Sequence, residues 1–142
     1  MTKDIIVTPI KIIPTHGGDV LHAFKESSVG FERFGEAYFS EIDKGAIKAW
    51  KKHYKMTLNI VVPVGKIKFV AYDDREPNNA QFHEVVLSRD NYCRLTIPPM
   101  VWLGFQGLSD SKSILLNIAN IEHDVNEVER ADLINIKYNW SN

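Results

Sequence analysis

Hydrophobic and polar positions alternate over short stretches along most of this 142-residue chain. The apolar runs are rich in Ile, Val, Tyr and Phe, and turn residues separate them. Runs of this kind are typical of β-strands in a sandwich or barrel. The strands that the pattern predicts cover residues 5–13, 37–42, 46–53, 56–64, 66–73, 83–87, 94–97, 113–118 and 133–140.

The segments between these runs indicate antiparallel neighbours and little helix. Residues 63–66 form a short turn, and residues 73–79 read as a polar surface loop. A short helix is expected at residues 19–25, where an aspartate can cap its start, and a second short turn at residues 126–130. An eight-stranded jelly roll fits this length and leaves few exposed strand edges. We therefore predict a mainly β jelly roll with one or two short helices, forming a single domain over residues 1–142.

Composition narrows the class of protein. Hydrophobic residues make up 44% and charged residues 25% of the chain, which predicts a globular domain rather than a disordered or fibrous protein. The 17 basic and 18 acidic side chains give a net charge of −1. This balance argues against a broad basic surface for nucleic acid, although it leaves room for a local anion pocket. The single cysteine, Cys93, rules out a disulfide within the chain and is expected to be a small buried apolar residue.

The same composition bears on location. No run is long and apolar enough to cross a membrane, and residues 1–18 do not resemble a signal peptide. We therefore expect a soluble protein of the reducing cytoplasm that makes no membrane contact.

The segment Gly-Ala-Ile-Lys-Ala-Trp-Lys-Lys-His at residues 45–53 carries the main candidate chemistry. Side chains two apart on a strand point to the same face, so one row contains Lys51 and His53 and the other contains Lys48 and Trp50. If the first row faces the inside of a barrel, Lys51 and His53 share a pocket. The alternative is an edge strand whose lysines discourage pairing with other chains.

Landmarks in a fixed order mark a resemblance to a known family. They are GAIKAWKKH, VPVGKIKFVAYDDR, EVVLSRDNYCRLTIPPMVWLGFQGLSD, SILLNIAN, EVERADL and YNW. Over roughly residues 5–142 the chain resembles the dTDP-4-dehydrorhamnose 3,5-epimerases and related bacterial nucleotide-sugar isomerases. The resemblance implies a cupin-type jelly roll, a twofold homodimer and a nucleotide-linked sugar as ligand, with no cofactor.

Members of that family take a proton from a carbon beside a ketone. The reaction needs a base, a group that stabilises the enolate oxygen and an acid on the other face. The resemblance places the family's basic histidine at Lys51 and the second histidine of a related branch at His53. It places an arginine of the same strand at Lys48, which can meet a phosphate as a point charge.

Other positions of the family's pattern also differ here. The family's histidine before its Gly-Phe pair is Leu103 in this chain, and its tyrosines correspond best to Asn117 or Ile118 and to His123. His123 can act as the acid because an imidazole titrates near neutral pH, and Tyr72 is the other candidate acid.

Two further residues complete the candidate binding site. Asn59 is expected beside Lys51, His53 and His123 if those side chains converge in a cavity. Trp102 forms either an aromatic wall on which a sugar or base stacks, or part of the core. The 5 histidines show no close metal-ligand spacing, so we expect no metal site.

Two hypotheses of different classes remain open. The first is an isomerase that acts on a nucleotide-linked 4-keto-6-deoxy sugar for surface polysaccharide or O-antigen synthesis, with altered catalytic groups. The second is a jelly-roll protein that binds a sugar or nucleotide, or has a regulatory role, and has lost the chemistry. The fold alone does not choose between them, because function belongs to the site.

Overall fold

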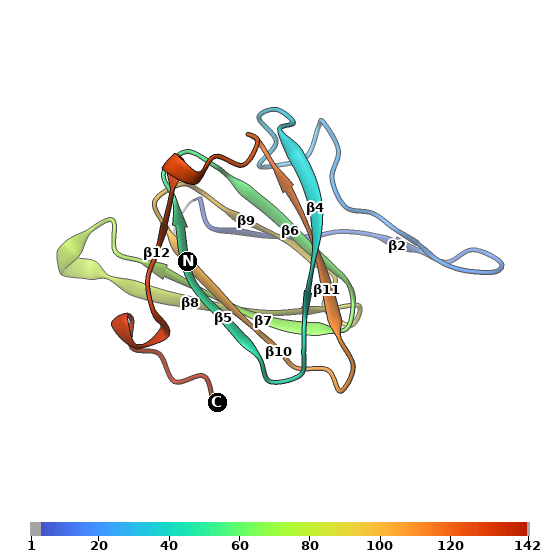
Figure 1. The fold of residues 1–142 in the computed structure, drawn as a ribbon. Coiled ribbons are helices and arrows are strands. Elements are labelled where there is room, and N and C mark those ends of the chain that lie inside the picture. The colour runs from blue at the N-terminus through green and yellow to red at the C-terminus, as the bar shows by residue number, and fades with distance from the viewer. Residues whose placement is uncertain (1–3, 142) are drawn as a thin grey trace.

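Two antiparallel β-sheets pack face to face in the computed structural model, which describes residues 4–141 (Figure 1). The first sheet has the strand order β1-β9-β6-β11-β4, and the second has the order β12-β5-β10-β7-β8. The strands of the first sheet are β1 (Ile6–Pro9), β4 (Glu36–Ile42), β6 (Leu58–Val64), β9 (Cys93–Ile97) and β11 (Ser113–Ala119). The strands of the second sheet are β5 (Ile47–His53), β7 (Lys66–Asp73), β8 (Gln81–Ser88), β10 (Trp102–Gly107) and β12 (Val128–Arg130). The predicted mainly β jelly roll is confirmed.

The smaller elements correct three of the predictions. A hairpin of β2 (Ile12–Ile13) and β3 (Val20–Leu21) extends away from the large sheets, and it takes the place of the helix expected at residues 19–25 (Figure 1). The strand expected at residues 133–140 is wrong, because this segment holds a short 3₁₀-helix, η3 (Leu133–Asn135), and then runs without strand pairing. Strand β10 was not predicted, because its two glycines and aromatic residues hide the alternation. The other short helices are η1 (Pro77–Asn79) and η2 (Val125–Glu127). None of the helices in the described part has the length and apolar character that a membrane span needs.

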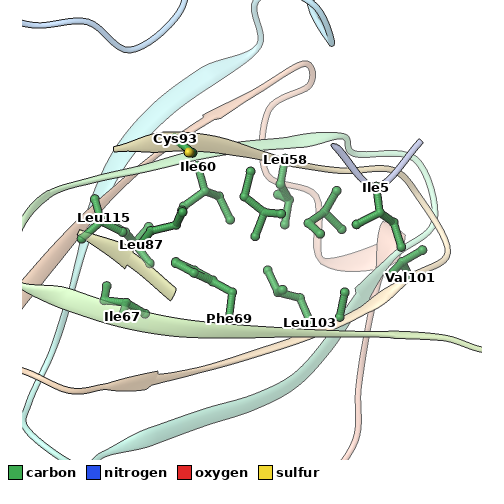
Figure 2. Packing of buried hydrophobic residues seen from close by; sticks show 14 of the residues in the cluster. Ile5, Leu58, Ile60, Ile67, Phe69, Leu87, Cys93, Val101, Leu103 and Leu115 are labelled. Atoms are coloured by element: carbon green, nitrogen blue, oxygen red, sulfur yellow. The ribbon is translucent and has the colours of Figure 1, made fainter. Parts of the chain in front are cut away.

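The core lies between the two sheets and follows the alternation of each strand. Every second residue of a strand faces inward, and Figure 2 shows such side chains from both sheets pointing toward one another. Leu58 and Ile60 of β6 meet Phe69 of β7 and Leu103 of β10 in this cluster. Cys93 is buried in it as well, and burial raises the pKa of its thiol, as expected for an inert apolar position.

A second apolar cluster covers the outer face of the second sheet. It is built from Trp50, Val70, Trp102 and Trp140, all of which are buried. Val70 alternates with the inward-facing Phe69, which places this cluster on the other side of the sheet. The segment that follows β12 therefore lies over the outer face of the second sheet, with Trp140 packed against it.

Candidate functional site

Strand β5 is irregular where it pairs with β10, and this irregularity builds the site. Leu103 of β10 lies opposite Lys51, and Phe105 lies opposite Lys48, so two residues of β5 face the single Gly104 between them. Such a bulge shifts the alternation by one residue. As a result Lys48 joins Lys51 and His53 on the inner side, whereas simple alternation had placed Lys48 on the opposite face. The edge-strand alternative is also wrong, because β5 pairs with β12 and β10 on its two sides.

The inner face of β5 borders a cavity of about 560 Å³ between the two sheets. This volume lies in the range of small-molecule sites, which combine an apolar lining with a few polar groups. The apolar floor consists of Leu58, Ile60, Leu103, Phe105 and Leu115. The main polar side chains around it are Tyr38, Lys48, Lys51, His53, Asn117 and Arg130.

His53 and Glu127 form a buried dyad at one end of this cavity. The Nδ1 atom of His53 lies 2.5 Å from Oε1 of Glu127, and the two residues are 6% and 3% exposed. The second carboxylate oxygen accepts hydrogen bonds from the backbone amides of Lys55 at 3.0 Å and Met56 at 3.2 Å. An ionised carboxylate can only accept, so Nδ1 of His53 carries the proton and Nε2 is left as the basic nitrogen.

The ionisation of the dyad follows from these contacts. Burial lowers the pKa of His53, although Glu127 acts in the opposite direction, so the imidazole is neutral at pH 7. Burial alone would raise the pKa of the Glu127 carboxyl, but the hydrogen bonds from His53 and the two backbone amides hold it below its usual value. The site thus contains a neutral imidazole oriented by a carboxylate, the arrangement that a general base requires.

Positive charge lies next to the dyad. Lys51 is half-buried, and burial followed by the nearby charge of Arg130 lowers the pKa of its ammonium group. Arg130 of β12 pairs directly with Lys51 in the sheet and lines the same cavity. Lys48 also lines it, and its Nζ donates a hydrogen bond of 2.7 Å to the backbone carbonyl of Glu41.

Tyr38 faces the cavity from the other sheet. Its hydroxyl accepts a hydrogen bond of 3.1 Å from Nδ2 of Asn117, and the Oδ1 of Asn117 accepts from the backbone amide of Asn59 at 3.2 Å. Asn117 therefore holds the tyrosine hydroxyl in place from the cavity wall, in agreement with its predicted position in the site.

The structure places four predicted site residues away from the cavity. The Asn59 side chain points to the outer face of β6, where its Oδ1 accepts from Thr96 at 2.7 Å, because Leu58 and Ile60 on either side face inward. Tyr72 and Trp102 pair with each other across β7 and β10. They belong to the outer cluster, since their inward-facing neighbours occupy the core, and this supports the core alternative for Trp102.

His123 is the fourth of these residues. It is exposed, and it contacts the first sheet through its backbone amide, which donates to Oε1 of Glu36 at 2.8 Å. Its place as the acid of the cavity is therefore not supported, because it does not line the cavity.

Sequence reasoning missed three polar residues of the candidate site. Glu127 and Arg130 lie in a charged stretch that reads as solvated surface, and only pairing of β12 with β5 brings them to His53 and Lys51. Tyr38 lies in a predicted strand, and the alternation that buries Ile42 also turns Tyr38 inward, which was the one available signal.

The described residues contain no group of three or more His, Cys, Asp or Glu side chains that could hold a metal ion. The absence of a metal stays a prediction, which metal analysis of protein purified without a histidine tag would test.

Known proteins resemble this chain in sequence and structure. A dTDP-sugar isomerase from Desulfovibrio desulfuricans G20 is 41% identical and superposes with a TM-score of 0.92, covering 98% of this chain and 92% of its own. A dTDP-4-dehydrorhamnose 3,5-epimerase from Sulfolobus tokodaii is 22% identical with a TM-score of 0.82, covering 97% and 82%, and this likeness concerns the fold. A Haloferax volcanii protein, the probable low-salt glycan biosynthesis epimerase Agl13, is 28% identical over 118 residues, which is 80% of this chain and 76% of that relative. No protein-family model matches the chain.

Proposed function

Because the chain belongs to the family of dTDP-sugar isomerases that includes the dTDP-4-dehydrorhamnose 3,5-epimerases, we propose that it moves a proton at a carbon beside the ketone of a nucleotide-linked 4-keto-6-deoxyhexose. The observation that carries this proposal is the His53–Glu127 dyad at the wall of an apolar cavity of suitable size. The neutral imidazole takes the proton through Nε2, and the carboxylate stabilises the imidazolium that forms.

The other polar groups of the cavity have roles that fit this reaction. Arg130 places positive charge near the base, where the carbonyl oxygen gains negative charge in the transition state. Tyr38 approaches from the opposite sheet and is the group that returns a proton to the other face of the sugar ring. Lys48 keeps two N–H donors beyond its bond to Glu41 and meets a phosphate of the nucleotide.

The apolar floor bears on the substrate class. Leu103 and Phe105 offer no hydrogen bonds, so this side of the cavity accepts a methyl group in preference to a hydroxymethyl group, which would lose its bonds to water. A 6-deoxy sugar meets this requirement. The Haloferax volcanii relative bears the name of a glycan biosynthesis epimerase, and we infer that the product here supplies surface polysaccharide or O-antigen synthesis in the cytoplasm.

A homodimer is part of the proposal. The projecting β2–β3 hairpin exposes Ile13 and Val20 at 40% and 49%, and a second copy would cover such apolar side chains. Size-exclusion chromatography with light scattering tests this, and a monomer at micromolar concentration would contradict it.

The decisive experiment is solvent deuterium exchange. Incubation with dTDP-4-keto-6-deoxyglucose in D₂O should replace the hydrogens on carbon 3, on carbon 5 or on both, as followed by proton NMR. His53→Asn should abolish the exchange, and His16→Asn is the matched control because that histidine is exposed and outside the cavity. A thermal shift with the sugar nucleotide but no exchange at either carbon would favour the non-catalytic binding protein instead.

A further inference from the structure

Strand β5 carries three lysines, at positions 48, 51 and 52, and the structure gives partners to two of them. Lys48 donates from Nζ to the carbonyl of Glu41, and Nζ of Lys52 lies 3.6 Å from the carboxylate of Glu129. The Nζ atom of Lys51 makes neither a hydrogen bond nor an ion pair with any residue between 4 and 141. Among these three lysines, Lys51 is therefore the one whose amine has no bonding partner between residues 4 and 141, and it lines the cavity next to His53.

The surroundings of Lys51 make the loss of its proton easier than for a solvated lysine, although the charge of Glu127 acts in the opposite direction. Leu103 lies opposite it on one side in the sheet, and Arg130 lies opposite it on the other. Like charges directly opposite each other destabilise a sheet, so this pair calls for a functional reason. A lysine that is desolvated or lies next to another cation loses its proton more readily and becomes a nucleophile, and both conditions lower the pKa of Lys51.

The spacing along β5 suits a ketone with a reactive neighbouring carbon. Lys51 and His53 are two residues apart, which corresponds to about 6.6 Å along a strand. Both side chains border the same cavity, so the amine can face the keto carbon of a bound sugar while the imidazole faces the hydrogen of a neighbouring carbon. Lys48 and Lys52 do not offer this geometry, because each is held by its own partner.

We propose that Lys51 Nζ is a nucleophile that forms an iminium with the keto carbon of the sugar in this cavity, an inference that rests on the function proposed above. The iminium nitrogen then accepts the electron pair that an enolate oxygen would otherwise carry. Lys51 is thus a catalytic residue that bonds covalently to the substrate.

The steps balance without any co-reactant other than water. The neutral amine attacks the keto carbon, the carbonyl π electrons move to oxygen, and that oxygen takes a proton from solvent while the nitrogen gives one up. The hydroxyl of this carbinolamine is protonated and leaves as water, and the nitrogen lone pair forms the C=N bond of the iminium. His53 removes the proton from the adjacent carbon, the C–H electrons form a C=C bond, and the C=N π electrons return to nitrogen. Proton return to either face restores the iminium, and one water molecule hydrolyses it to the ketone and the free amine.

Reductive trapping tests the covalent step. The intact protein is incubated with dTDP-4-keto-6-deoxyglucose and sodium cyanoborohydride, which reduces iminium ions in preference to ketones, and peptides are mapped by mass spectrometry. We expect a peptide containing residue 51 to gain the mass of the sugar nucleotide less one oxygen atom. Lys51→Arg should lose this adduct, and Lys52→Arg, whose side chain lies outside the cavity, should keep it.

A second measurement needs only the wild-type protein. Hydrolysis of the iminium exchanges the keto oxygen with solvent, so in H₂¹⁸O the protein should accelerate incorporation of ¹⁸O at carbon 4 above the spontaneous rate. This result and the mapped adduct decide the question even if Lys51→Arg fails to fold.

The outcomes separate the two proposals. Deuterium exchange that depends on His53, without an adduct at Lys51 and without accelerated ¹⁸O incorporation, overturns the iminium and leaves the isomerase function standing. An absence of deuterium exchange together with an absence of trapping overturns both.

Discussion

Replacement of Glu127 by glutamine tests whether the dyad is the catalytic base. The carboxylate accepts from Nδ1 of His53, from the amide of Lys55 and from the amide of Met56, and it is 3% exposed. A glutamine has one oxygen and one NH₂ group, so it cannot accept on both sides. If its NH₂ faced the two backbone amides, two buried donors would be left unpaired at a cost of about 1–3 kcal/mol each. The glutamine oxygen therefore faces the amides, and its NH₂ donates to His53.

This orientation inactivates the base without removing it. When Nδ1 of His53 must accept, the proton of the neutral ring moves to Nε2, and Nε2 can no longer take a proton from the substrate. The corresponding change of tautomer in a Ser-His-Asp triad lowers kcat about 10⁴-fold. For Glu127→Gln we expect a loss of about 10²- to 10⁴-fold in the rate of deuterium exchange, the range of general-base catalysis. The loss of charge from three hydrogen bonds should lower the free energy of unfolding by about 2 kcal/mol.

The assay is the initial rate of deuterium exchange by NMR, together with urea unfolding of the same samples. Glu129→Gln is the matched control, because Glu129 lies two residues along the same segment. Among residues 4–141 its carboxylate contacts only Tyr54 at 2.8 Å and Lys52 at 3.6 Å, near the surface. Exchange by Glu127→Gln at the wild-type rate would refute the dyad as the base. The pH profile adds a check, because the lowered pKa of His53 should keep kcat/KM on its plateau below the ordinary value of 6.5.

Three further predictions follow from the described contacts. The pKa values of His53 and Glu127 are both below their unfolded values, so the stability that these groups contribute is present above pH 6.5 and is lost as the pH falls. Urea titrations should therefore give a lower free energy of unfolding at about pH 5.5 than at about pH 7.5. The decrease should be smaller in His53→Asn. Tyr38→Phe should slow epimerisation by about 10²- to 10⁴-fold while leaving deuterium exchange close to wild type, because it removes the hydroxyl that Asn117 holds but not the base. Arg94 is 2% exposed and donates to the carbonyl of Val29 at 2.7 Å, so Arg94→Met should orphan that acceptor and lower the free energy of unfolding by about 1–3 kcal/mol in urea titration.

The alternation of the sequence predicted most of the fold because it reflects burial directly. Strand β7, for example, begins and ends where the pattern of residues 66–73 placed it. The pattern failed at residues 133–140, where Ile136, Tyr138 and Trp140 alternate because they pack on the outer face of the second sheet and not because the segment pairs as a strand. Alternation reports which side chains are buried, and it does not report which backbone groups are paired.

The site was predictable only where the strand is regular. Lys51 and His53 share the cavity as their spacing of two predicts. Lys48 does not follow the same rule, because the bulge opposite Gly104 depends on tertiary pairing. Glu127 could not be predicted for a similar reason. Nothing in the local sequence of this charged stretch indicates that Glu127 will contact His53, which lies 74 residues earlier in the chain.

Gly104 allows strand β5 to line the cavity on one side of the sheet and to contribute to the outer cluster on the other. A Cβ atom at this position would lie 2.7 Å from Cβ of Ala49 and 3.1 Å from the ring of Trp140, closer than side chains tolerate. Without a side chain there, Ala49 can occupy the bulge and Trp140 can pack on β10 from outside.

The outer cluster therefore stabilises the pairing of the strands that line the cavity. The Trp50 and Trp140 rings pack with their centroids 5.5 Å apart on the outer face, and Trp140 belongs to the segment that follows β12. Trp50 and Ala131 also exchange backbone hydrogen bonds of 3.0 and 3.1 Å, which continue the pairing of β12 with β5. Packing that anchors this segment outside the sheet thus keeps β12 against β5, and with it both the carboxylate that orients His53 and the arginine opposite Lys51. The aromatic residues of the outer face act on the chemistry by fixing the strand that carries these groups, although their rings do not reach the dyad.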